Sequence, residues 1–185
     1  MTVLALAVSV LSSSLFIVDA SSEATYSVAV PRAVLRAYVD DIDLLSRNMR
    51  GVVSIMPLGN NRYRYQTEKA IPLSGPLRTE FIIRKIVHGD SLTVYRSESI
   101  HDENYMSCKV RLVPDGESHT KITISLRVRL SRENPSEVHW LAPVLGEDFI
   151  SDRMRSDLEG MLKEFVGRST EELNHGVAIP AAAKK

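Results

Sequence analysis

The sequence has a single cysteine, Cys108, and no excess of charge of either sign. One thiol cannot form an intramolecular disulfide, which excludes a small domain held together by several disulfides. The 23 basic and 23 acidic residues give a formal net charge of zero. Because a nucleic-acid binder must neutralise many phosphates with clustered cations, we expect no nucleic-acid partner.

Motifs for cofactors, nucleophiles and metals are also missing from the sequence. Its nine glycines form neither of the glycine-rich loops that hold phosphates, and no G-x-S-x-G motif occurs. No two of its five histidines have the H-x-x-x-H spacing of metal ligands. We therefore predict no cofactor, no metal site and no catalytic residue, and we expect His101, Asp102 and Glu103 to form a solvated connector.

The chain is long enough for one domain, and its 44% of hydrophobic residues can form a sizeable core. Residues 2–18 carry no charge and include four serines. A secretory leader normally has a basic residue before its apolar run, and the serines make this run a poor membrane span. Residues 1–22 are thus an apolar N-terminal extension with three interpretations: a leader or anchor, an extension that packs or frays, or a mis-assigned start. We favour a cytoplasmic location.

The first part of the domain predicts a strand followed by two short helices. Residues 23–30 are mostly small or β-branched, as in a strand. Pro31 suits the first turn of a helix, and apolar residues then recur at helical spacing as far as residue 49. Asp41 is a candidate N-cap, which favours a break into two helices at this point.

Six further strands are predicted between turn signals such as Gly59-Asn60-Asn61. They cover residues 51–58, 62–69, 77–88, 91–100, 105–113 and 121–130. The last two alternate clearly, with Cys108, Val110, Ile124 and Leu126 on their apolar faces. Such alternation is typical of a sheet with one buried and one solvated face, which needs a cover.

The cover is predicted in residues 148–166, where apolar residues recur at steps of three and four along a single amphipathic helix. Before it, Pro143 separates an apolar turn, residues 139–145, from the long helix. The last residues, 174–185, are expected to form a frayed tail.

This order of elements resembles the START and birch-pollen-allergen superfamily, also called SRPBCC. The resemblance rests on YSVAVPRAVLRAYVDDIDLLSRNM at the front, TKITISLRVRL as the last strand, and DFISDRMRSDLEGMLKEFV as the long helix. It implies an α+β helix-grip fold over residues 23–173. In that fold a curved antiparallel sheet of about seven strands wraps around the C-terminal helix, with two short helices after the first strand.

The resemblance also implies a cavity between sheet and helix. We expect a hydrophobic small molecule, such as a lipid, quinone, isoprenoid or pigment, to be bound or transported there. The alternatives are a polyketide cyclase or dehydratase, and a binding module in peripheral contact with a membrane. The sequence does not define an oligomeric state.

The candidate cavity residues are apolar or aromatic and lie on the faces expected to be buried. They are Tyr63, Tyr65, Phe81, Ile83, Met106, Cys108, Val110, Ile124, Leu126, Met154, Leu158, Met161 and Leu162. If they face inward, the two tyrosines can orient a ligand with their hydroxyls; otherwise they are ordinary strand aromatics. The apolar turn contributes Trp140, Leu141, Val144 and Leu145, which either close one end of the cavity or touch a membrane or partner.

Overall fold

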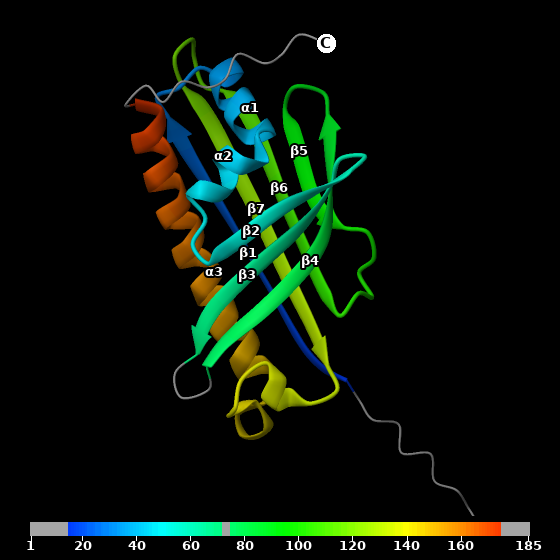
Figure 1. Cartoon of the computed structure of the whole chain (residues 1–185). Coiled ribbons are helices and arrows are strands. Elements are labelled where there is room, and N and C mark those ends of the chain that lie inside the picture. Colours follow the sequence, from blue (N-terminus) through cyan, green and yellow to red (C-terminus); the bar gives the residue numbers. More distant parts are fainter. Residues whose placement is uncertain (1–14, 72–74, 175–185) are drawn as a thin grey trace, which may run out of the picture.

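The computed structural model describes residues 15–71 and 75–174. One strand, two short helices, six more strands and a long helix follow one another in the predicted order (Figure 1). In chain order the elements are β1 (Phe16–Val28), α1 (Arg32–Asp40), α2 (Ile42–Arg47), β2 (Val52–Gly59), β3 (Arg62–Ile71), β4 (Gly75–His88), β5 (Leu92–Ser97), β6 (Asn104–Pro114), β7 (Thr120–Arg132), the 3-10 turn η1 (Pro135–Glu137) and α3 (Ala142–Asn174).

All seven strands form one antiparallel sheet in the order β1-β7-β6-β5-β4-β3-β2. The sheet curls so that β2, β3 and β4 cross in front of β1 and β7, and α3 runs along its side (Figure 1). This architecture confirms the predicted α+β helix-grip fold.

The apolar faces of β6 and β7 are buried, as their alternating residues predict. Cys108 pairs with Leu126 and Val110 with Ile124 across the two strands, and all four side chains are buried. The helix that covers the sheet, α3, also buries the predicted apolar side, which includes Ile150, Leu158, Leu162 and Phe165. Sheet and helix thus press their apolar faces together.

The break between the two short helices is where the sequence predicts it. The Asp41 side chain accepts hydrogen bonds from the backbone N–H groups of Asp43 and Leu44, at 3.0 and 3.1 Å. These donors have no partner within the first turn of α2, so the carboxylate caps it. Asn60 and Asn61 both have positive φ and form the predicted tight turn between β2 and β3.

The predicted boundary at residue 23 was wrong, because β1 begins at Phe16. Phe16, Val18 and Ala20 point into the core, while Asp19 points outward and accepts a 2.9 Å hydrogen bond from Arg127 of β7. That bond lowers the pKa of Asp19. Residues 16–22 therefore belong to the sheet, and the rest of the proposed extension, residues 1–14, lies outside the described residues.

The last helix starts earlier than residue 148 and has a break near its beginning. Residues 142–145 are helical, with Pro143 in the first turn, but Gly146 has φ 78° and ψ 171° and interrupts the helix. The apolar turn is thus separated from the main helix by Gly146 rather than by Pro143. Of the predicted tail, Asn174 ends α3, and residues 175–185 lie outside the described residues.

Candidate ligand-binding cavity

A cavity of about 600 Å³ lies between the sheet, α2 and the middle of α3. Its floor comes from β2 to β7, one wall from α2 and the loop after it, and the other wall from α3. Binding pockets for drug-sized molecules measure roughly 300–1,000 Å³. The space is therefore large enough for a ligand.

Nine of the thirteen predicted residues line this cavity. They are Tyr65, Phe81, Ile83, Met106, Cys108, Leu126, Met154, Leu158 and Met161. They come from β3, β4, β6, β7 and α3, so the fold brings together side chains that are far apart in the sequence. Both methionines of α3 are half-buried, and a flexible thioether adapts well to ligands of irregular shape.

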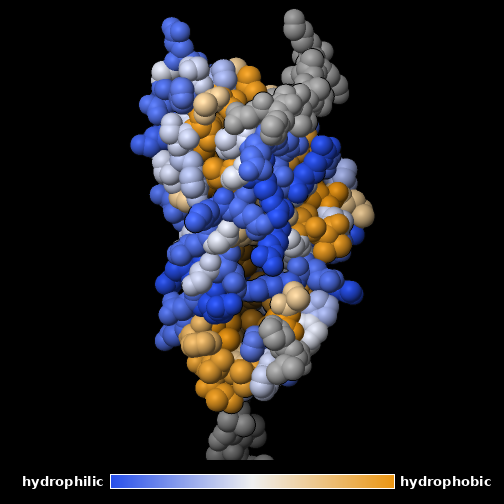
Figure 2. Space-filling model, turned by 90° about the vertical axis from the view of Figure 1, so that its left-hand side faces the viewer, coloured by the Kyte–Doolittle hydropathy of each residue, from blue (hydrophilic) through white to orange (hydrophobic). Residues whose placement is uncertain are grey.

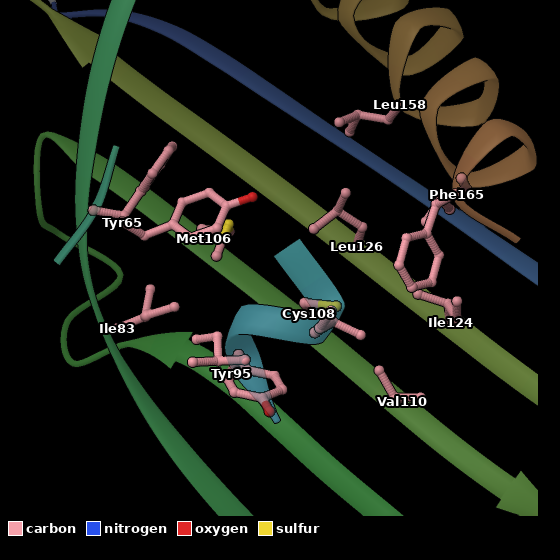
Figure 3. Packing of buried hydrophobic residues seen from close by; sticks show 14 of the residues in the cluster. Tyr65, Ile83, Tyr95, Met106, Cys108, Val110, Ile124, Leu126, Leu158 and Phe165 are labelled. Carbon is pink, nitrogen blue, oxygen red and sulfur yellow. The ribbon is translucent and has the colours of Figure 1, made fainter. Parts of the chain in front are cut away.

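The other four predicted residues lie outside the cavity wall. Val110, Ile124 and Leu162 are at most 1% exposed and belong to a part of the core with little free space. The second void, near Phe165, measures only about 20 Å³. Figure 3 shows Phe165, Ile124 and Val110 on one side of the core, and Tyr65 and Met106 on the other.

Tyr63 shares the inward face of β3 with Tyr65 but does not line the cavity; it lies near Asp41 and Asp43, at the start of α2. Burial raises the pKa of its phenol, and the nearby carboxylates of Asp43 and Asp41 add to this effect. The face on which the two tyrosines lie is therefore the inner one, yet only Tyr65 reaches the free space.

Tyr65 and Tyr95 are both buried phenols in the cavity wall, but their hydroxyls differ in partner. The Tyr95 hydroxyl donates to the backbone carbonyl of Val39 at 2.7 Å. The Tyr65 hydroxyl has one hydrogen-bond partner among the described residues, the Met49 sulfur at 3.5 Å. Burial raises the pKa of both phenols, so both stay protonated near neutral pH.

Cys108 lies in the floor of the cavity and is 3% exposed. Burial raises the pKa of its thiol to about 12. Because the thiolate is the nucleophile, a thiol with so high a pKa is chemically inert near neutral pH. The structure thus places Cys108 in the wall as an apolar residue.

Charged residues gather where the cavity opens to solvent, and we call Arg50, Glu68, Lys69 and Asp157 the mouth. Lys69 of β3 forms an ion pair with Asp157 of α3 across the opening. Glu68 pairs with Arg78 at 2.8 Å. Seen from the side of α3, the molecule has a hollow with a hydrophobic floor and a hydrophilic rim (Figure 2). The opening therefore suits a polar group and the interior an apolar one.

Several lining residues were not among the predicted candidates. They include Ile42, Leu45, Met49, Ile55, Leu77, Thr79, Tyr95, Val128 and Leu130. Ile42 and Leu45 were visible as apolar residues at helical spacing, but the sequence does not say that α2 lies over free space. Val128 and Leu130 continue the alternation of β7 and could have been predicted from it.

The apolar turn does not close the cavity, because Trp140, Leu141, Val144 and Leu145 are absent from its wall. Val144 is 81% exposed and Trp140 45% exposed. They lie where α3 begins, at an end of the molecule whose surface is hydrophobic (Figure 2). The structure thus does not place the apolar turn in the cavity wall.

Within residues 15–71 and 75–174, no three or more His, Cys, Asp or Glu side chains are grouped as metal ligands. None of the helices in these ranges combines the length and the apolarity that crossing a membrane requires.

Taken together, the fold and the cavity define a helix-grip protein with an internal, mostly apolar space. No protein-family model matches the sequence, and no curated protein matches it. Solved structures do match. A START superfamily protein from Mycobacterium smegmatis is 17% identical, with a TM-score of 0.58 over 83% of this chain and 98% of that one.

Two proteins described as aromatase/cyclase or ARO/CYC have the same fold. The Zhui aromatase/cyclase from Streptomyces sp. R1128 is 14% identical, with a TM-score of 0.52 over 89% of this chain and 99% of that one. The di-domain ARO/CYC StfQ of the steffimycin biosynthetic pathway is 14% identical, with a TM-score of 0.56 over 88% of this chain and 53% of that one. The chain thus has the START-like fold that the resemblance implied, and it spans about half of StfQ.

Proposed function

We propose that the protein binds a hydrophobic small molecule in the cavity between sheet and α3. The observation that carries the proposal is the cavity itself, about 600 Å³ with a largely apolar wall and a charged mouth. One water occupies about 30 Å³ of liquid, so this volume corresponds to about 20 non-hydrogen atoms. Burial of apolar surface contributes about 25 cal/mol per Å² to the free energy of binding, and binding of this kind requires no catalytic residue.

Native mass spectrometry of protein purified from its own host tests the proposal. We expect an added mass of about 300 Da, the size of a molecule with about 20 non-hydrogen atoms. The added mass should disappear after unfolding, because only the folded chain encloses the cavity. Protein that carries no added mass and takes up no hydrophobic dye such as Nile red would contradict the proposal.

A cyclase or dehydratase is the second candidate, favoured by the fold of the aromatase/cyclase proteins and by the position of Tyr65 inside the cavity. Acid–base catalysis works best when the pKa of the acid or base lies near the working pH. Burial raises the pKa of Tyr65 well above that range, and that of Cys108 to about 12. The charged residues stand at the mouth, where Lys69 is paired with Asp157. We therefore rank binding above catalysis.

Contact with a membrane is a further candidate, and it involves a different surface. We call Trp140, Val144, Leu145 and Phe149 the apolar end; they are between 37% and 81% exposed. A cluster of exposed large apolar side chains is unusual on a soluble protein and marks a contact site. Tryptophan is enriched at membrane interfaces because its ring is amphipathic. A carrier with such an end can exchange an apolar cargo with a bilayer.

Flotation with lipid vesicles tests this contact. The vesicles should consist of zwitterionic phosphatidylcholine, because the carboxylates of Glu147 and Asp148 beside the apolar end disfavour anionic lipid. We expect the protein to float with the vesicles and the double variant Val144→Ser, Phe149→Ser to remain in solution. Val53→Ser is the matched control, since Val53 is 63% exposed on β2, outside the apolar end. Equal flotation of both variants, or none of the wild type, would rule out the contact.

A further inference from the structure

Three tyrosines of the core are buried, and two of them have full-strength hydrogen-bond partners. The Tyr38 hydroxyl lies 3.1 Å from Ser169 and accepts a 2.7 Å bond from Asn48. The Tyr95 hydroxyl donates to the Val39 carbonyl at 2.7 Å. Both phenols therefore have the partners that buried hydroxyls normally have, and both stabilise the packing of α1.

Tyr65 is the exception. Tyr65 is only 6% exposed, and within residues 15–71 and 75–174 the one hydrogen-bond partner of its hydroxyl is the Met49 sulfur, at 3.5 Å. A thioether is a weak acceptor, so the donor is left nearly unsatisfied. Figure 3 shows the ring extending from β3 with its hydroxyl directed towards Leu126, into the cavity, whereas the Tyr95 hydroxyl points away from Tyr65. An unsatisfied buried hydroxyl is costly, and a ligand oxygen would remove that cost.

The surroundings of Tyr65 select the kind of oxygen. Its neighbours in the wall include Phe81, Met106 and Leu126, which are apolar, and its ring lies 6.3 Å from that of Phe81. The ionisable side chains of the wall that carry charge belong to the mouth. A carboxylate or phosphate at Tyr65 would lose its hydration without gaining a counter-ion. A neutral carbonyl or hydroxyl oxygen requires only one donor, which Tyr65 supplies.

We propose that the Tyr65 hydroxyl donates a hydrogen bond to a neutral carbonyl or hydroxyl oxygen at the buried end of the ligand. This inference rests on the proposed binding function and narrows its ligand to a class. The class is that of apolar ketones, quinones, esters and alcohols of about 20 non-hydrogen atoms. It excludes a fatty acid bound with its carboxylate inside. Because burial raises the pKa of Tyr65, the phenol remains a donor throughout the neutral range.

Two compounds of nearly equal shape and of the proposed size test the assignment: methyl heptadecyl ketone, and the alkene in which a methylene group replaces the ketone oxygen. Displacement of Nile red gives the affinity of each compound. We expect wild-type protein to bind the ketone about fivefold to tenfold more tightly than the alkene, as one hydrogen bond predicts. Tyr65→Phe should remove this preference, so that the ketone and the alkene bind about equally.

Tyr95→Phe is the matched control, because its hydroxyl is committed to Val39. It should retain the ketone preference even if it lowers the melting temperature. A preference that persists in Tyr65→Phe, or wild-type protein that binds both compounds equally, would overturn the assignment while binding itself stands. Binding of neither compound would overturn the proposed function, and the assignment with it.

Discussion

Replacing Leu126 by tryptophan is expected to weaken the binding of hydrophobic compounds strongly while the protein stays folded. Leu126 lies in the middle of β7, is 5% exposed, and points into the cavity opposite α3. An indole ring at this position enters free space, so it displaces the ligand rather than other side chains. We expect the affinity for Nile red to fall by about a hundredfold, corresponding to roughly 3 kcal/mol. Added apolar burial should keep the melting temperature at or above that of the wild type.

Ile124→Trp is the matched control, two residues away on the same face of the same strand. Ile124 is fully buried and does not line the cavity, so the larger ring must displace its neighbours. Overpacking of this kind costs about 1–3 kcal/mol or more and lowers the melting temperature. Thermal unfolding and dye titration of both variants distinguish the two sites. Equal destabilisation by the two tryptophans would mean that the cavity is not free space, and unchanged dye binding in Leu126→Trp would locate the ligand elsewhere.

Most of the fold follows from local patterns that a single sequence displays. The alternation of β6 and β7 indicates which face is buried, and the helical spacing after residue 148 indicates the stripe that covers it. Asp41 marks a helix start by a bond within three residues of itself. These features depend on neighbours in the chain, which is why the sequence suffices to predict them.

The position of the free space could not be predicted in the same way. Val110 and Ile124 have the same pattern as Cys108 and Leu126, yet only the second pair lines the cavity. What separates the pairs is the cover: Phe165 lies on the side of the first (Figure 3), whereas the second faces free space that Tyr65 of β3 and Phe81 of β4 also line. Periodicity shows which way a side chain points, but it does not show whether the partner on the other side fills the space.

The missed start of β1 has a different cause. Phe16, Val18 and Ala20 alternate with Ile17 and Asp19, but Ile17 is also apolar, so the alternation is indistinct. The signal that resolves the boundary is long-range, because Asp19 bonds Arg127 more than a hundred residues later. A pattern read within a short window cannot contain that contact.

This boundary leads to the last prediction: a chain that begins at Glu23 should fail to fold, compared with a chain that begins at Leu15. The longer chain keeps Phe16, Val18 and Ala20, which are 8%, 0% and 1% exposed. Loss of each large buried side chain costs roughly 2–5 kcal/mol, and the pairing of β1 with β7 is lost as well. The sum exceeds about 5 kcal/mol, which is comparable with the whole stability of an ordinary domain. Circular dichroism and urea unfolding of the two chains measure the difference.

A pair of point variants separates the contribution of the buried face from that of chain length. Val18→Asp places a carboxylate in the core with no partner and should unfold the protein. Ser21→Asp adds the same charge three residues later, on the exposed face and opposite Arg127, and should change stability by no more than about 0.5 kcal/mol. If Val18→Asp unfolds at the same urea concentration as Ser21→Asp, residues 16–22 do not contribute to the core. The domain would then begin at residue 23, as the sequence alone predicts.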